Sequence, residues 1–186
     1  MRPFFLATLA LLSAPACSES PDTSVGALAP EIIGRDLEGR PFKLSDYHGQ
    51  VVLLDFWGHW RGPCREMYPH ARGLMEQYRD APFAIVGVNS DRDRVKAAAL
   101  CEVEHLSWRS FWDGAGGRRG PIAAAWNIQG WPTICIIDAK GVIRCKTQVD
   151  DEETIDRTIQ ELLAELKVAE PEPEFSSSES PAEDSK

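Results

Sequence analysis

The sequence lacks the features of a nucleic-acid-binding protein and of a membrane-spanning one. Its formal net charge is −9, and no cluster of Lys and Arg offers the basic patch that nucleic acid requires. The most apolar run, from Phe4 to Leu12, is far too short to cross a bilayer. We therefore expect neither nucleic acid as a partner nor a transmembrane helix.

Histidine is also scarce in this sequence. The four histidines are His48, His59, His70 and His105. They show no ligand spacing, so we expect no metal site and no other cofactor.

The amino terminus has the pattern of an export signal. Arg2 precedes the apolar run, and Ala14-Pro15-Ala16 supplies a small-x-small cleavage pattern. Cys17 follows directly and resembles the lipid-attachment site of bacterial lipoproteins. We expect a signal peptide over 1–16 and a periplasmic or cell-envelope protein. It is either anchored to the membrane through lipid on Cys17 or cleaved and released.

Composition divides the rest of the chain into three parts. Residues 17–29 are small and polar, as in a tether. Residues 30–167 have the size of one domain. Residues 168–186 carry six acids and one Lys, so we expect an acidic disordered tail.

Strand and helix patterns alternate within residues 30–167. The run Val51–Trp57 is apolar except for one acid, as in a strand buried on both faces of a sheet. The other expected elements are strands at 83–88 and 108–112, hairpins turning at 37–39 and 139–141, and helices over 62–78 (kinked at Pro69), from a cap at Asp91 to about Val103, over 121–126 and over 150–167. This order predicts an α/β fold, with a mixed sheet covered by helices on both faces.

Two segments resemble the thioredoxin superfamily. The stretch from Asp55 to Cys64 is similar to its active-site segment, in which Trp-Cys-Gly-Pro-Cys follows a buried strand and precedes a kinked helix. Gly130-Trp131-Pro132-Thr133 is similar to its cis-proline segment. The leading hairpin and the insert between Asn89 and Gly130 resemble the TlpA/ResA branch of exported thiol-disulfide oxidoreductases, which is grouped with AhpC/TSA redoxins. The resemblance implies a thioredoxin-like three-layer sandwich that acts on protein thiols and disulfides.

The chain departs from this family at Arg61. The family has its attacking Cys there, whereas Cys64 matches the resolving Cys. Exchange needs a thiolate to attack sulfur and a second thiol to resolve the mixed disulfide, and a guanidinium does neither. We therefore expect a degenerate site with impaired dithiol exchange.

Two charged residues of the segment each allow two interpretations. Asp55 matches a buried acid of the family, which makes it a proton acceptor for Cys64, or it is a leftover acid paired with a cation such as Arg61. Arg61 binds an anion or favours the thiolate of Cys64, or it is a solvated charge.

The cis-proline segment carries the expected binding surface. The resemblance implies that Pro132 is cis and that substrate chain docks on the backbone of Trp131. Trp60 and Trp131 either form an aromatic lip that binds this chain or simply cover the core.

The last hairpin predicts a cysteine pair. If Asp138 pairs with Val142, Cys135 and Cys145 face each other across the strands, which favours a disulfide. The alternative is two free buried thiols, and Cys101 has no evident partner.

Three functions remain open from the sequence. One is a thiol-disulfide oxidoreductase weakened by Arg61. Another is a redox-inactive module of the cell envelope that binds extended polypeptide. The third is a scaffold whose acidic tail or lipid recruits partners.

Overall fold

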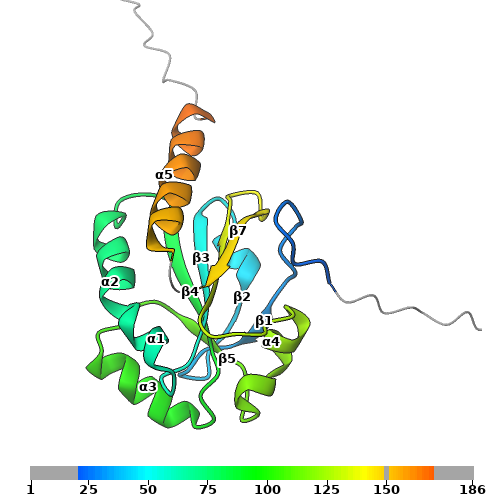
Figure 1. Ribbon diagram of the computed structural model, residues 1–186, viewed down its shortest axis with the longest axis vertical. Helices are drawn as coiled ribbons and strands as arrows, with labels where there is room; N and C mark the ends of the chain where they lie inside the picture. The colour runs from blue at the N-terminus through cyan, green and yellow to red at the C-terminus, as the bar shows by residue number, and fades with distance from the viewer. Residues whose placement is uncertain (1–20, 149–150, 170–186) are drawn as a thin grey trace, which may run out of the picture.

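The computed structural model describes residues 21–148 and 151–169 of the 186-residue chain. Its centre is a five-stranded sheet in the order β5-β4-β3-β6-β7, and a separate hairpin, β1-β2, precedes it (Figure 1). The elements are β1 (Ile33–Arg35), β2 (Pro41–Lys43), η1 (Leu44–Tyr47), β3 (Val51–Trp57), α1 (Gly62–Glu66), α2 (Tyr68–Gln77), β4 (Phe83–Asn89), α3 (Arg94–Val103), β5 (Ser110–Trp112), η2 (Gly117–Arg119), α4 (Pro121–Ala125), β6 (Thr133–Ile137), β7 (Ile143–Gln148) and α5 (Glu152–Ala169). The expected α/β class, mixed sheet and N-terminal hairpin are confirmed.

The centre of the sheet is built by the most apolar segments. β3 pairs parallel with β4 from Val51 opposite Phe83 to Trp57 opposite Asn89, and every residue of β4 is buried. β6 and β7 are antiparallel to their neighbours. Strands buried on both faces need apolar residues at consecutive positions, which explains the unbroken runs in the sequence.

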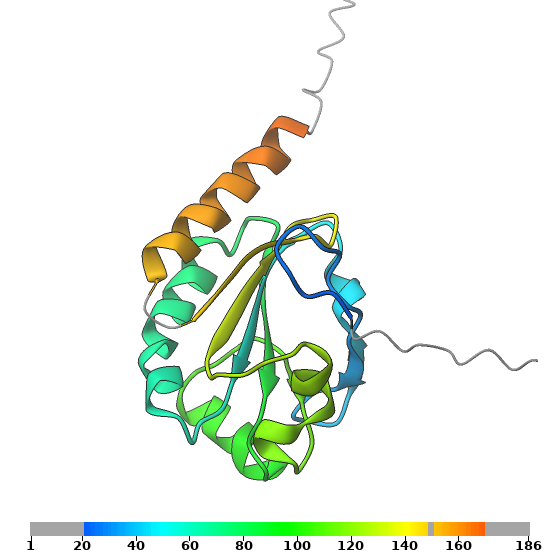
Figure 2. The same cartoon turned by 45° about the vertical axis from the view of Figure 1, so that its right-hand side comes forward.

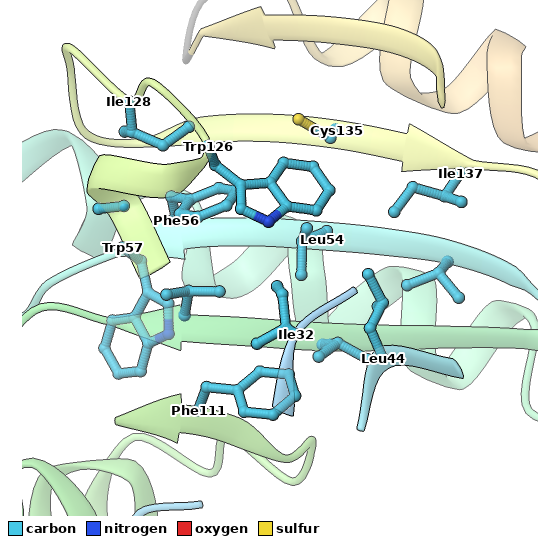
Figure 3. Packing of buried hydrophobic residues seen from close by; sticks show 14 of the residues in the cluster. Ile32, Leu44, Leu54, Phe56, Trp57, Phe111, Trp126, Ile128, Cys135 and Ile137 are labelled. Carbon is cyan, nitrogen blue, oxygen red and sulfur yellow. The ribbon is translucent and has the colours of Figure 1, made fainter. Parts of the chain in front are cut away.

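Alternate residues of β3 face two separate hydrophobic layers. Val51 and Leu53 face the layer covered by α2 and α5. Leu54 and Phe56 face the other layer, where Figure 3 shows them among side chains of the N-terminal region, β5 and the α4 segment. Figure 2 shows α2 and α5 together on their side of the sheet. Both faces of the sheet are therefore covered, and a functional site is expected at the ends of the strands.

The helix expected over 62–78 is divided in two. α1 ends at Glu66 and α2 starts at Tyr68, with Met67 between them. Pro69 has no N–H to continue the ladder of α1, so the break follows from its position. The expected kink is confirmed.

The expected disulfide between Cys135 and Cys145 is wrong. The hairpin does close with Asp138 N–H donating to Val142 O at 2.9 Å, but the register shifts between Ile136 and Ile137. Cys135 then lies opposite Lys146, and Cys145 lies opposite Ile136. A slip of one residue turns a side chain to the other face of the sheet, so the two sulfurs belong to different layers and are free thiols.

Two further expectations need correction. The tether is shorter than 17–29, because Gly26 N–H donates to Ile143 O and Ala29 N–H to Gly141 O, both at 2.8 Å. The cap of α3 is Asp93, which accepts from Lys96 N–H, and not Asp91.

The expected signal peptide, Cys17 and the acidic segment beyond Ala169 lie outside the described residues. None of the helices in the described ranges has the length and apolarity to span a membrane.

Candidate functional site

The site expected from the sequence forms where β3 ends and β6 begins. Phe56 of β3 lies opposite Thr133 of β6, so the loop after β3 adjoins the segment before β6. Arg61 is extended and directly precedes α1, which places Cys64 in the first turn of this helix. The structure thus brings together the two segments that carry the resemblance.

Cys64 is a buried thiol. Only 1% of the residue is exposed. Burial raises the pKa of this thiol to about 12, against a smaller lowering by a backbone hydrogen bond with Gly58. The nearby charge of Arg61 also lowers the pKa of Cys64, but burial prevails. Cys64 is therefore a protonated thiol in neutral solution.

Asp55 is the second titratable group at the site. Its Oδ1 is buried and has no hydrogen-bond partner within the described residues. Burial raises the pKa of this carboxyl from 3.8 to about 7. No ion pair with Arg61 or a Lys is present in the described part of the chain, so the interpretation as a paired leftover acid is not supported. Asp55 can exchange a proton near neutral pH.

Arg61 points to the cis-proline segment and not to Asp55. Its Nε donates to the backbone carbonyl of Trp131 at 2.6 Å, although Arg61 is an exposed residue. The peptide bond between Trp131 and Pro132 is cis, as expected. The guanidinium thus occupies an acceptor on the backbone that directly precedes this proline.

The two tryptophans differ in role. Trp131 is 7% exposed, and its Nε1 donates to Ser90 Oγ at 2.8 Å, which fixes the ring in the core. Trp60 is 43% exposed, and its ring centroid lies 6.1 Å from that of Trp131. The exposed ring is therefore that of Trp60, whereas the ring of Trp131 is buried.

Sequence reasoning missed Asp91 as a residue of the site. Asp91 Oδ2 accepts from His59 N–H at 2.9 Å and from Asn89 Nδ2 at 2.7 Å, which fixes the loop before Trp60. A signal was present, because polar residues directly after a parallel strand commonly line a ligand crevice. Within residues 21–148 and 151–169, no cluster of three His, Cys, Asp or Glu side chains is arranged to hold a metal ion.

Known proteins are similar to this chain in sequence and in fold. A sequence model of the redoxin family matches residues 24–166. The chain belongs to the redoxin family. The thiol-disulfide oxidoreductase ResA of Geobacillus kaustophilus is 30% identical to this redoxin over 127 residues, which are 68% of this chain and 71% of that protein.

Solved structures agree with this assignment. The thioredoxin domain of a thiol-disulfide oxidoreductase from Bacteroides vulgatus is 27% identical, with a TM-score of 0.64 over 74% of this redoxin and 99% of that chain. A secreted thiol-disulfide isomerase from Corynebacterium glutamicum shares the fold at 22% identity, with a TM-score of 0.63 over 80% of this redoxin and 96% of that chain. The redoxin therefore has a thioredoxin-like fold and is related to thiol-disulfide oxidoreductases.

Proposed function

We propose that this redoxin is an exported member of the TlpA/ResA-like thiol-disulfide oxidoreductase family in which Arg61 stands at the position of the attacking Cys, so that dithiol exchange is impaired. The observation that carries the proposal is the state of Cys64. It is the one thiol within the Arg61–Cys64 segment, and it is buried with its pKa raised to about 12.

The expected loss can be judged from the thiolate population. A thiol whose pKa is about 12 is deprotonated in roughly one molecule in 10⁵ at pH 7. Attack on a disulfide depends on the thiolate and on access to it, and Cys64 lacks both. The charge of Arg61 does not offset this burial. A mechanism that uses Cys64 alone is therefore too slow to replace the missing thiol.

Export of the protein rests on the sequence of its amino terminus. Arg2, the apolar run after it and Ala14-Pro15-Ala16 support cleavage by a signal peptidase. Cys17 supports attachment of lipid and a location at the cell envelope. The possible substrates are then protein thiols and disulfides outside the cytoplasm.

Reduction of insulin by dithiothreitol tests the proposal. We expect the wild-type chain to give no rate above the uncatalysed reaction. Arg61→Cys is expected to restore catalysis, because it adds a thiol at the start of α1, where the helix dipole stabilises a thiolate.

A matched control separates the position from the mere addition of a thiol. Arg65→Cys places a thiol within α1, at an exposed arginine four residues after Arg61, and is expected to leave the rate at background. Adding Cys64→Ser to Arg61→Cys should abolish the gained turnover, because the resolving thiol is lost. Wild-type turnover that Cys64→Ser removes would defeat the proposal.

A second function, binding of extended polypeptide without exchange, is favoured by the surface beside Trp60. A cavity of about 470 Å³ adjoins this half-exposed ring. The family docks substrate on the backbone before the cis proline, and here Arg61 Nε already holds the Trp131 carbonyl at 2.6 Å. A bound chain therefore either displaces Arg61 or lies on the Trp60 side.

Binding of a labelled, carboxymethylated insulin B chain tests this second function. Trp60→Ala is expected to weaken binding several-fold, because an aromatic anchor is removed. Val103→Ala is the control. It truncates an exposed apolar side chain that does not line the cavity, at the end of α3, and should leave binding unchanged. Equal binding by wild type and Trp60→Ala would exclude a binding site beside this ring.

A further inference from the structure

The cavity beside Trp60 has a charge pattern that the redox site does not explain. It lies between the loop after β3, the loop after β4, the first turns of α3, and η2. Figures 1 and 2 both place α1 and α3 at the same end of the molecule. A volume of about 470 Å³ is within the range of sites that bind a ligand or an anchoring side chain.

Both carboxylates that line the cavity are already engaged within the protein. Asp91 Oδ2 accepts from the backbone of His59 and from Asn89, as described above. Asp93 Oδ1 accepts from Lys96 N–H at 3.1 Å, and its Oδ2 lies 3.8 Å from Lys96 Nζ. Asp91 therefore holds the loops that form the wall of the cavity, and Asp93 caps α3 and partly balances the charge of Lys96.

The other two cations, Arg92 and Arg118, are unpaired. Within the described residues neither guanidinium has a hydrogen bond or a carboxylate partner, and both side chains are exposed. Arg118 Cζ lies 5.5 Å from the ring centroid of Trp60. Arg92 passes close to Gly117, where a Cβ atom would lie 3.4 Å from Arg92 Cγ. Arg118 is thus within cation–π range of Trp60, and the N–H groups of both guanidiniums are free to bind a carboxylate.

The cavity thus carries positive charge on an acidic protein. Three lysine and arginine residues against two carboxylates give +1 with His59 neutral, whereas the whole chain has −9. Free guanidinium groups favour carboxylates, which they bind through two parallel hydrogen bonds. The aromatic wall adds a contact for an apolar group next to the anion.

We propose that this cavity binds an acidic segment of an extended polypeptide, with carboxylates on Arg92 and Arg118 and a neighbouring apolar side chain against Trp60. The inference rests on the proposed polypeptide binding beside Trp60 and names the chemistry of the bound chain. A polypeptide is favoured over a small anion because the cavity combines two free guanidinium groups with an exposed aromatic ring, and one chain can offer both carboxylates and an apolar side chain.

Two peptides that carry fluorescein on the amino terminus test the proposal on the full chain: Gly-Glu-Phe-Glu-Leu-Gly-amide and its counterpart with Gln in place of both Glu. At about 50 mM NaCl, where exposed charges are weakly screened, we expect the acidic peptide to bind roughly fivefold to tenfold more tightly. At about 500 mM NaCl the preference should shrink to less than about twofold. Arg92→Gln with Arg118→Gln should abolish this preference, so that the variant binds the Glu and Gln peptides with equal affinity.

A matched control removes the same charge elsewhere. Arg79→Gln with Arg157→Gln changes two exposed arginines that do not line the cavity, and it should keep the preference. Melting curves by circular dichroism show whether each double variant is folded. Equal affinity for the two peptides in the wild type, or a preference that survives loss of Arg92 and Arg118, overturns the inference alone. If neither peptide binds, both this inference and the proposed polypeptide binding are overturned. The proposed loss of dithiol exchange is not affected, because the insulin assay tests it separately.

Discussion

Replacing the carboxyl of Asp55 by an amide is expected to change little below about pH 4 and to stabilise this redoxin increasingly as the pH rises from there to about 7. Burial raises the pKa of Asp55 from 3.8 to about 7. Between these values the folded chain holds a proton that the unfolded chain has released. The stability that the wild type gains from this proton is complete below about pH 4 and is lost as the pH rises to about 7.

The magnitude follows from the two pKa values. The interval from 3.8 to about 7 corresponds to roughly 4 kcal/mol, at 1.36 kcal/mol for each pKa unit. Asp55 as a whole retains some exposed surface although its Oδ1 is buried, so the measured value should fall below this limit. Between about pH 4 and pH 7, the unfolding free energy of Asp55→Asn minus that of the wild type should rise by up to about 1.4 kcal/mol per pH unit.

Urea unfolding followed by tryptophan fluorescence, at intervals from about pH 4 to pH 9, measures this difference directly. Any change in packing caused by the amide is independent of pH, so the slope isolates the titration of Asp55. Asp80→Asn, at a side chain that is 91% exposed, provides the control and should give a nearly flat difference. A flat difference for Asp55→Asn between pH 5 and pH 8 would refute the reasoning.

Two further predictions concern stability. Asp36→Ala should lower the unfolding free energy in urea by roughly 3 kcal/mol, because the fully buried carboxylate accepts from Arg109 Nη2 at 2.7 Å and from Arg40 N–H at 2.7 Å. Glu38→Ala, at a largely exposed side chain of the same hairpin, should cost less than about 1 kcal/mol, and equal losses would contradict this difference. Asp113→Ala removes the acceptor of two amides in the first turn of α4 and should cost about 1–2 kcal/mol, with faster hydrogen exchange in that helix. Unchanged exchange would show that this carboxylate does not hold α4.

Local sequence patterns determined most of the fold. The run from Val51 to Trp57 has too many consecutive apolar residues for any exposed element, and it is the central strand. Pro69 breaks its helix through its own covalent structure. In these cases the physical cause lies within a few residues, so the sequence was sufficient.

Features that depend on tertiary contacts were predicted poorly. The disulfide failed because one register shift after Ile136, invisible in the sequence, turns Cys135 and Cys145 to opposite faces. The contact between Arg61 and the Trp131 carbonyl joins residues 70 positions apart. Composition and periodicity describe neighbouring residues and cannot predict a contact between residues so far apart in the sequence. The sequence located the candidate site, whereas only the structure showed what Arg61 contacts there.

The most direct measurement for this redoxin is whether Cys64 attacks a disulfide. The native wild-type chain is incubated with excess oxidised glutathione at neutral pH, quenched in acid and mapped by peptide mass spectrometry. We predict no glutathione on Cys64 in the native chain and ready modification once the chain is unfolded in urea. Rapid formation of the mixed disulfide at Cys64 in the folded protein would contradict the central claim, that no reactive thiolate remains at this site.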